Sequence, residues 1–318
     1  MIAFMFPGQG AQYVGMGVDL ADRHPVARRV FDEASEATGI DLLGLCRDGP
    51  EERLRQTELT QPAILTCSWA IASTLAAAGI HPALAAGLSL GEYTALVAAG
   101  ALGFADAARV VRERGRFMQD AASGRAVAMA AVLGLPAQTV VEICRAVPGF
   151  VEVANFNAPG QTVIAGDIAA VDAVGGPLRA AGARRVVRLD VSAPFHTSLM
   201  RPAAERLAPL LQSIPLSHAR IPVVANVSAQ PVRRPEEIRV ALTEQVAHPV
   251  RWEQSLHTLR GLGATLYLEV GPGTTLAGLA RRTVPGAAVM SVENQETLEA
   301  VQTHLRAASA PASRAQHG

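Results

Sequence analysis

The sequence predicts an α/β protein with a mainly parallel sheet and a smaller lobe inserted into the chain. Strand-like apolar runs alternate with helix-like stretches along most of the sequence. Three predicted strands end at glycine-rich turns, and the segment 125–191 has its own β-α-β-β-α-β order, which is typical of a ferredoxin-like unit. We therefore expect a core from 1–124 and 192–306, a ferredoxin-like small subdomain over 125–191, and a disordered tail over 307–318.

The composition is that of a globular protein with a sizeable core. Of its 318 residues, 49% are hydrophobic and 18% are charged. The 28 basic and 28 acidic residues cancel, so the chain has no excess of cationic charge with which to bind nucleic acid. All of these basic residues are arginine, which excludes a Schiff-base lysine.

The cysteines and the N-terminus indicate a soluble cytoplasmic protein. Cys46, Cys67 and Cys144 are odd in number and show no C-x-x-C spacing, so we expect buried free thiols in a reducing compartment. The chain runs from an apolar strand over 2–6 directly into Pro7, unlike a signal peptide, and no apolar run reaches the length of a membrane span. We expect no metal and no redox cofactor.

The first half of the core is predicted to contain two strands and four helices. The first strand is too hydrophobic for a sheet edge. The helix over 56–78 has Pro62 near its first turn and apolar side chains at helical spacing. In the helix over 104–122, four arginines point in different directions, so they cannot all face solvent. In order, the elements are a strand over 2–6, helices over 16–37 and 56–78, a strand over 82–86, and helices over 92–101 and 104–122.

The lobe and the second half of the core continue the alternation. The lobe has predicted strands over 126–133, 151–155, 162–165 and 184–191 and helices over 136–146 and 168–181. After it come predicted helices over 198–212, 236–248 and 252–262 and strands over 221–226 and 265–270. Three core strands, ending at Phe6, Ala86 and Val270, lead into glycine-rich turns. Because sites in such sheets lie at the carboxyl ends of the strands, we expect these loops to line one crevice.

The sequence Gly87-Leu88-Ser89-Leu90-Gly91 has the form of a nucleophile elbow, which predicts an α/β-hydrolase-like core. In such a turn, glycines two residues either side of the serine are needed because a Cβ there would collide with neighbouring backbone. The following helix directs its N–H groups at an anion formed beside Ser89. The same residues also suit an ordinary strand–loop–helix connection with a serine N-cap.

The glycine-rich loop over 7–12 allows two interpretations. It could cradle a phosphate, but it has neither the G-x-G-x-x-G pattern nor a P-loop lysine. Alternatively, its backbone N–H groups serve an oxyanion hole, which needs small residues for the same steric reason.

His196 is the best candidate for a base that activates Ser89, because it follows a proline-containing loop after a predicted strand. Five other histidines lie in polar or capping contexts and are expected at the surface: His24, His81, His218, His257 and His317. A Ser-His-Asp triad would place its acid between the serine and the histidine, and the nearest acids there are Asp167, Asp172 and Asp190. All three fall within the lobe. The missing acid counts against an ordinary hydrolase and favours a base oriented by a backbone carbonyl.

Six motifs occur together and in a recognisable order. They are Pro7-Gly8-Gln9-Gly10, Gly87-Leu88-Ser89-Leu90-Gly91-Glu92-Tyr93, Arg114-Gly115, Asn155-Phe156-Asn157-Ala158-Pro159-Gly160-Gln161, Pro194-Phe195-His196 and Glu269-Val270-Gly271-Pro272-Gly273. In this order they resemble the malonyl-CoA:acyl carrier protein transacylases, including the stand-alone acyltransferases and acyltransferase domains of polyketide synthases. The resemblance covers residues 1–295.

The resemblance implies a serine–histidine dyad. Ser89 would attack the thioester of malonyl-CoA and His196 would take its proton, while the main-chain carbonyl of Gln245 orients the histidine. The oxyanion hole would use the backbone N–H groups of Gln9 and Leu90. The malonyl group would then pass to the phosphopantetheine thiol of an acyl carrier protein, in fatty acid or polyketide biosynthesis.

The resemblance also implies which residues bind the acyl group. Arg114 would hold the free carboxylate of the malonyl group, and Gln9 would be a second substrate-binding residue. Phe195 would narrow the pocket against the α-methyl group of methylmalonyl. The sequence departs from the family at Leu88, where histidine is usual; this affects acyl preference or carrier choice and leaves the dyad intact.

An acidic carrier protein would require a basic surface near the crevice. The candidates are Arg184, Arg185 and Arg188 on the lobe and Arg281 and Arg282 after the Gly-Pro-Gly turn. We expect a monomer. The alternatives are an acyl-thioester hydrolase of the same fold that clears acyl carrier proteins, a transacylase for another acyl unit, and an inactive carrier-docking protein.

Overall fold

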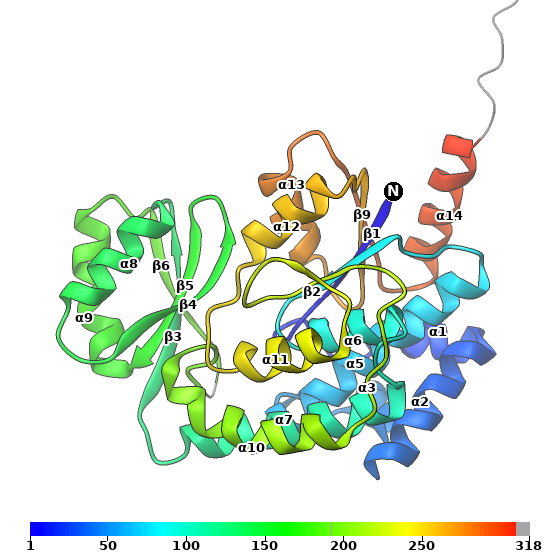
Figure 1. Cartoon of the computed structure of the whole chain (residues 1–318), viewed down its shortest axis with the longest axis horizontal. Helices are drawn as coiled ribbons and strands as arrows, with labels where there is room; N and C mark the ends of the chain where they lie inside the picture. Colours follow the sequence, from blue (N-terminus) through cyan, green and yellow to red (C-terminus); the bar gives the residue numbers. More distant parts are fainter. Residues whose placement is uncertain (192, 310–318) are drawn as a thin grey trace, which may run out of the picture.

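The structure, a computed structural model, describes residues 1–191 and 193–309. Two sheets and the helices around them make up the chain (Figure 1). Before the lobe lie β1 (Ile2–Phe6), α1 (Val18–Arg23), α2 (Pro25–Thr38), α3 (Leu42–Asp48), α4 (Glu51–Leu54), α5 (Thr57–Ala77), β2 (Leu84–Gly87), α6 (Gly91–Ala98) and α7 (Phe104–Ala122). The lobe contains β3 (Val127–Leu133), α8 (Ala137–Ala146), β4 (Val151–Ala158), β5 (Gln161–Asp167), α9 (Ile168–Ala180) and β6 (Arg185–Leu189). After it come the 3₁₀ turn η1 (Ser198–Met200), α10 (Arg201–Ser213), β7 (Val223–Val224), β8 (Pro231–Val232), α11 (Pro235–Gln245), α12 (Trp252–Gly261), β9 (Leu266–Val270), α13 (Thr275–Thr283), β10 (Ala288–Val292) and α14 (Gln295–Ser309).

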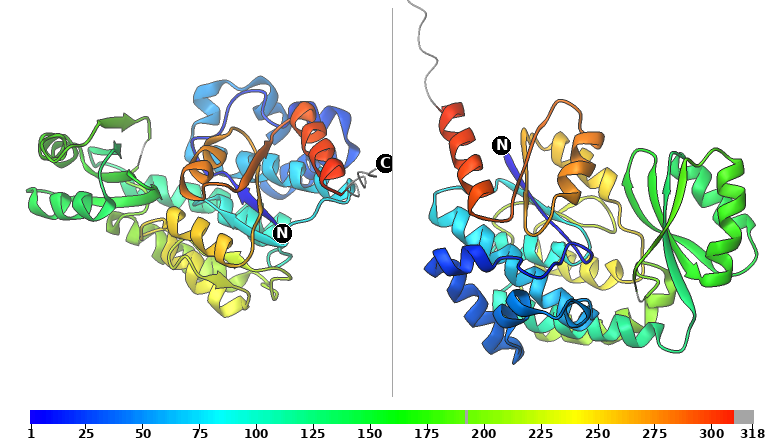
Figure 2. Two further views of the ribbon diagram at one scale, coloured as in Figure 1. Left: turned by 90° about the horizontal axis from the view of Figure 1, so that it is seen from above. Right: turned by 180° about the vertical axis from the view of Figure 1, so that it is seen from behind.

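The larger sheet has the strand order β10-β9-β1-β2-β7-β8 and is parallel except for β8. Its strand β1 lies between β9 and β2, away from either edge, as its apolar sequence predicts. Phe4 and Phe6 face a hydrophobic cluster that includes residues of α2, α5 and α7, whereas Ala3 and Met5 face a cluster with residues of α12 and α13. Helices therefore cover both faces of the sheet (Figure 2).

The lobe is an antiparallel sheet in the order β4-β5-β3-β6, with α8 and α9 packed on one face. Its edge strand β4 is joined to the core by two backbone hydrogen bonds, from Phe156 N–H to Val250 O (2.8 Å) and from Val250 N–H to Ala154 O (2.9 Å). Figure 1 shows the lobe beside the core. The predicted α/β fold with an inserted ferredoxin-like unit is confirmed, while the exact subdomain boundaries stay a prediction.

Parts of the core differ from the sequence prediction. The helix expected over 16–37 is two helices, because Pro25 begins α2 and the preceding His24 is extended. The strand expected over 221–226 is reduced to the short β7, and the helix expected over 236–248 ends at Gln245. No element was predicted beyond 273, where α13, β10 and α14 follow.

The C-terminal prediction also needs correction. The tail was expected to begin at 307, but α14 continues to Ser309, and the remainder of that tail lies outside the described residues. Among the helices of the described part of the chain, none is long and apolar enough to cross a membrane.

Candidate active site

The elbow after β2 has the geometry that its glycines predict. Ser89 adopts a left-handed backbone conformation, with φ +54°. A Cβ on Gly87 would lie 1.9 Å from the carbonyl group of Gly91, and a Cβ on Gly91 would lie 2.0 Å from the carbonyl oxygen of Phe6. Because both residues are glycines, β2 can approach α6 and β1 closely enough to present Ser89 at the tip of the turn.

Ser89 and His196 form a hydrogen-bonded pair. The distance from Ser89 Oγ to His196 Nε2 is 2.7 Å, and His196 Nδ1 lies 2.8 Å from the main-chain oxygen of Gln245. That oxygen can only accept, so Nδ1 carries the ring proton and Nε2 presents a lone pair to the serine hydroxyl. The imidazole is therefore oriented by a backbone carbonyl, and it can act as the base for Ser89.

His196 is neutral at physiological pH. Its side chain is buried, and burial together with the positive charge of Arg114 lowers its pKa from 6.5 to about 4. None of the three predicted acids takes part in the pair: Asp167 is bound to Arg125, Asp172 to Arg188 and Asp190 to Arg55.

Arg114 is a buried cation that faces Ser89. Only 1% of the residue is exposed, and its Nη2 donates to Ser89 Oγ (3.1 Å) and to Gln245 Oε1 (2.9 Å). Its Nη1 donates to Gln61 Oε1 (2.9 Å), and the guanidinium lies over the ring of Tyr93. Within the described residues no carboxylate forms an ion pair with Arg114; its charge is met by amides, a hydroxyl and an aromatic ring, and at longer range by the buried carboxyl of Glu92.

The side chain of Gln245 links the components of the site, a role that sequence reasoning missed. Its Oε1 accepts from Arg114, and its Nε2 donates to Ser89 O (2.9 Å) and to Glu92 Oε2 (2.7 Å). Burial raises the pKa of Glu92 to about 7, although the hydrogen bonds from Asn226 N–H and Gln245 and the charge of Arg114 oppose this. A polar residue in an otherwise apolar segment is the sequence signal that could have identified Glu92 and Asn226.

Of the two amides predicted for the oxyanion hole, one belongs to the elbow and the other to a separate loop. Leu90 precedes α6, and Gln9 is in the loop after β1. In the described part of the chain the backbone N–H groups of Gln9 and Leu90 donate to no other group, so both are available to an incoming oxygen. The side chain of Gln9 donates from Nε2 to Thr57 Oγ1 (3.3 Å).

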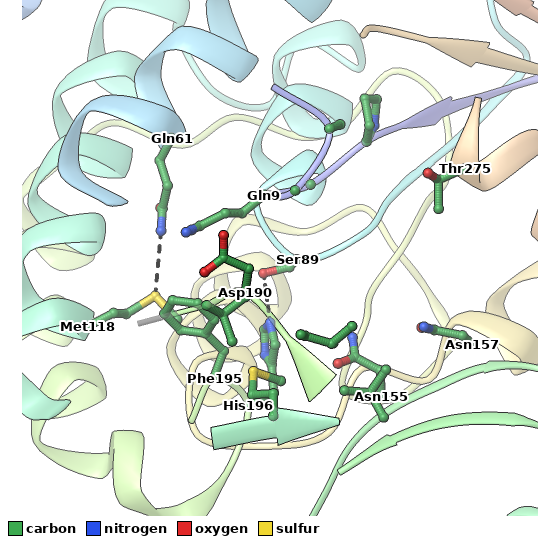
Figure 3. Close-up of a pocket in the computed structure, with 18 of the residues that line it drawn as sticks. Gln9, Gln61, Ser89, Met118, Asn155, Asn157, Asp190, Phe195, His196 and Thr275 are labelled. Atoms are coloured by element: carbon green, nitrogen blue, oxygen red, sulfur yellow. Dashed lines mark hydrogen bonds between the residues drawn. The ribbon is translucent and has the colours of Figure 1, made fainter. Parts of the chain in front are cut away.

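A cavity of about 410 Å³ opens in front of Ser89 (Figure 3). The loops after β1 and β2 contribute to its wall, as predicted, whereas the glycine-rich turn after β9 does not, and the first residues of α13, Thr275 and Leu276, line the cavity instead. The core loops and α7 meet β4 and β6 of the lobe around it. Its apolar side chains include Met118, Met129, Val163, Leu189 and Phe195.

The remaining predicted residues lie away from this cavity. His24, His81, His218 and His257 are exposed or half-buried, and His317 lies outside the described residues. All three cysteines are free and buried, as expected. The arginines suggested for a carrier surface are exposed, but Arg188 pairs with Asp172 and Arg281 donates to a backbone carbonyl. No three His, Cys, Asp or Glu side chains cluster in metal-binding positions among the residues that the structure covers.

Comparisons with known proteins agree on one family. The acyl transferase domain family matches residues 3–310. The chain is 43% identical over 306 residues to the malonyl CoA-acyl carrier protein transacylase of Bacillus subtilis, covering 95% of this chain and 96% of that protein. Identity to the Escherichia coli K12 protein of the same name is 46% over 285 residues, or 89% and 92% of the two chains.

Solved structures give the same result. An acyl carrier protein S-malonyltransferase from Vibrio cholerae superposes with a TM-score of 0.91 at 42% identity, over 94% of this chain and 99% of that one. A malonyl-transacylase in complex with a type II polyketide synthase acyl-carrier protein superposes with a TM-score of 0.92, also at 42% identity, over 95% and 99%.

Proposed function

The chain belongs to the acyl transferase family, among the malonyl-CoA:acyl carrier protein transacylases, and we propose that Ser89 carries the malonyl group during transfer. The enzyme transfers this group from coenzyme A to an acyl carrier protein. The supporting observation is the arrangement of Ser89 between a neutral histidine and a buried arginine, with Oγ 2.7 Å from His196 Nε2 and 3.1 Å from Arg114 Nη2.

The proposed first half-reaction forms the acyl-enzyme. Ser89 Oγ attacks the thioester carbonyl while its proton passes to His196 Nε2, and the N–H groups of Gln9 and Leu90 bind the oxyanion. The C–S bond then breaks, and the departing thiolate of coenzyme A takes the proton from His196. Gln245 O keeps the other ring nitrogen protonated throughout, so the imidazole is returned in its starting tautomer.

The second half-reaction runs through the same groups in reverse. The phosphopantetheine thiol of the carrier gives its proton to His196 and attacks the ester carbonyl. The bond to Ser89 Oγ breaks, and the serine oxygen recovers its proton from the imidazolium. The product is a malonyl thioester on the carrier, and the enzyme is regenerated.

Arg114 is proposed to hold the free carboxylate of the malonyl group. A buried charge is costly unless a partner of opposite sign meets it. Since Arg114 is 1% exposed and forms no ion pair with a described carboxylate, the malonyl carboxylate is the partner that completes the site. Gln9 lines the cavity as a second substrate-binding residue, and Phe195 limits the space beside the α-carbon.

The pathway, the surface that binds the carrier, the compartment and the oligomeric state are also proposals. The structural relative in complex with a type II polyketide synthase carrier supports a carrier partner of either the fatty acid or the polyketide kind. We propose that the carrier docks on the lobe, where Arg184 and Arg185 are exposed. The buried free thiols suit a cytoplasmic protein, and we propose that it acts as a monomer.

Intact-protein mass spectrometry tests this function. The protein is incubated briefly with malonyl-CoA, methylmalonyl-CoA and acetyl-CoA in parallel. We expect a malonyl adduct that Ser89→Ala abolishes and that added holo-carrier protein discharges. An adduct that forms equally on Ser89→Ala would refute the acyl-enzyme, and one that decays as fast without carrier would establish the hydrolase instead.

The same experiment tests Phe195. A serine at this position would free space for an α-methyl group, a difference of about 1–3 kcal/mol in an apolar pocket. Phe195→Ser should therefore raise the ratio of methylmalonyl to malonyl adduct by about tenfold or more. An unchanged ratio would contradict the proposed role of the phenyl ring.

A further inference from the structure

Beyond the dyad, we propose that Asn226 is a positioning residue that fixes the conformation of the nucleophile; this inference rests on the proposed role of Ser89. Asn226 lies just after β7 and is fully buried. Its side-chain Oδ1 accepts a hydrogen bond from Ser89 N–H (2.6 Å), and its Nδ2 donates to Gly87 O (2.7 Å). One amide side chain therefore binds the backbone on both sides of residue 88.

The elbow needs such a partner because it leaves the regular sheet. The parallel ladder between β2 and β7 ends at the pair of Ala86 and Val224, before the turn begins. Beyond that point the strand cannot supply partners for the backbone groups of the elbow. The Asn226 side chain supplies these partners instead. Only one orientation of its amide group does so, the one in which Oδ1 faces the donor, Ser89 N–H, and Nδ2 faces the acceptor, Gly87 O.

The left-handed conformation of Ser89 makes this contact more important. A non-glycine residue with φ +54° is strained and persists only where its surroundings hold it. The hydrogen bond from Ser89 N–H to Asn226 restrains that φ, because rotation about the N–Cα bond of Ser89 would turn its N–H away from Oδ1. Without Asn226, the N–H and the Gly87 carbonyl would be buried next to an apolar side chain.

Asn226 is itself anchored to the groups that hold the base. Its own N–H donates to Glu92 Oε2 (3.0 Å), and the same oxygen accepts from Gln245 Nε2 (2.7 Å). Gln245 in turn holds His196 through its main-chain oxygen. A chain of hydrogen bonds thus runs from the nucleophile through Asn226, Glu92 and Gln245 to the base, and it sets the position of Ser89 Oγ relative to His196 Nε2.

The location of Asn226 determines which kinetic step it affects. It does not line the cavity, and in the described structure it forms no hydrogen bond with Arg114 or Phe195. Loss of its side chain should therefore slow attack by Ser89 and leave binding of the malonyl carboxylate almost unchanged. A displacement of the reacting oxygen by about 1 Å can cost about 100-fold in rate.

The test compares Asn226→Ala and Asn226→Asp with the wild-type protein. The rate of Ser89 acylation by malonyl-CoA is followed by rapid quench and intact mass, over a range of concentrations that separates kcat from KM. Inactivation by phenylmethylsulfonyl fluoride reports the reactivity of Ser89 without any malonyl carboxylate. We expect Asn226→Ala to lower the acylation rate and the inactivation rate by a similar factor of about 10–100, with KM changed less than about threefold.

Asn226→Asp keeps the side-chain volume and the acceptor for Ser89 N–H but loses the donor to Gly87 O. Its acylation and inactivation rates should therefore lie between those of the wild type and of Asn226→Ala. If Asn226→Ala does not fold, this variant alone decides the question. Asn294→Ala is the control, since Asn294 Oδ1 also accepts from a backbone N–H, that of Thr297 at the start of α14, and its loss should leave both rates unchanged.

Acylation and inactivation within about twofold of wild type in a folded Asn226 variant would overturn the proposal. A rise in KM with unchanged kcat would overturn it too, because it would place Asn226 in substrate binding. Failure of the proposed function itself is separate, since it would appear as an adduct on Ser89→Ala whatever happens at position 226.

Discussion

Replacing Arg114 by alanine should remove the preference for a malonyl group and leave most of the chemistry of Ser89 intact. The guanidinium is buried and lies within hydrogen-bond distance of Ser89 Oγ. In a malonyl group the free carboxylate is bonded to the α-carbon next to the reacting carbonyl, so a malonyl ester on Ser89 would place this carboxylate beside the guanidinium. A carboxylate placed there can accept two charge-assisted hydrogen bonds, each contributing about 1.5–3 kcal/mol. Acetyl-CoA has no such carboxylate and gains nothing from this residue.

These magnitudes set the expected result. Loss of two such bonds, about 3–6 kcal/mol in all, corresponds to a decrease of about 10²- to 10⁴-fold in kcat/KM for malonyl-CoA. For acetyl-CoA the decrease should stay below about tenfold, from the lost contacts of Arg114 with Ser89 and Gln245. The assay is transfer to a holo-carrier protein with each donor, and the quantity that matters is the ratio of the two kcat/KM values.

The two-donor design separates substrate recognition from damage to the fold. Arg114→Ala also removes the donor to Gln61 Oε1, so the free energy of unfolding is measured alongside. Arg112→Ala is the control on the same helix, because Arg112 donates to Thr38 O and does not line the cavity. Equal losses with malonyl-CoA and acetyl-CoA would refute the carboxylate role and indicate a disturbed dyad.

Two further predictions concern the base and the elbow. Because the pKa of His196 is lowered to about 4, the neutral base persists as pH falls, and kcat/KM should change less than about twofold between pH 7 and pH 5. A histidine of ordinary pKa would lower kcat/KM about 25-fold over that range, and an acid limb near pH 6.5 would contradict the structure. Gly91→Ala should destabilise the protein by about 3 kcal/mol or more in denaturant unfolding, since its Cβ would lie 2.0 Å from Phe6 O. Gly278→Ala in α13, where a Cβ meets nothing within 4 Å, should stabilise it by about 0.5–1 kcal/mol; equal changes in the two variants would show that the elbow glycine has no steric role.

The elbow was predictable from sequence because its constraints are local. Gly87, Ser89 and Gly91 follow one another in a single turn, and a Cβ on Gly87 would collide with the backbone of Gly91 in that same turn, although a Cβ on Gly91 would collide with Phe6 of β1. The central position of β1 was predictable for a similar reason, since an uninterrupted apolar run has no side that could face water.

The rest of the site was harder to predict from the sequence because its contacts join segments that are far apart in the chain. Asn226 is 137 residues from Ser89 in the sequence, and Gln61 is 53 residues from Arg114. Nothing in the local pattern around either amide states which backbone or side chain it will meet. The backbone carbonyl of Gln245 came from the family resemblance, and the work of its side chain became visible only in the structure.

The missed C-terminal elements have a different physical cause. The strand β10 lies at the edge of the sheet, is mostly half-exposed and pairs only with β9 in the described sheet, although its sequence is no less hydrophobic than that of β9. Similarly, β7 forms only a two-residue ladder with β2, whereas the prediction extended this strand to the buried Asn226. In both places a short or exposed ladder depends on tertiary contacts more than on the strand's own pattern.

The proposed role of Arg114 links recognition of the malonyl carboxylate to the basicity of His196. In the free site the positive charge of Arg114 is one of the causes, after burial, that hold the pKa of His196 near 4. A like charge opposes formation of the imidazolium that attack by Ser89 requires. A bound malonyl carboxylate would neutralise Arg114, remove that opposition and raise the pKa of His196 when the proton has to be taken. Acetyl-CoA brings no such carboxylate, so we expect His196 to keep its lowered pKa when acetyl-CoA is bound.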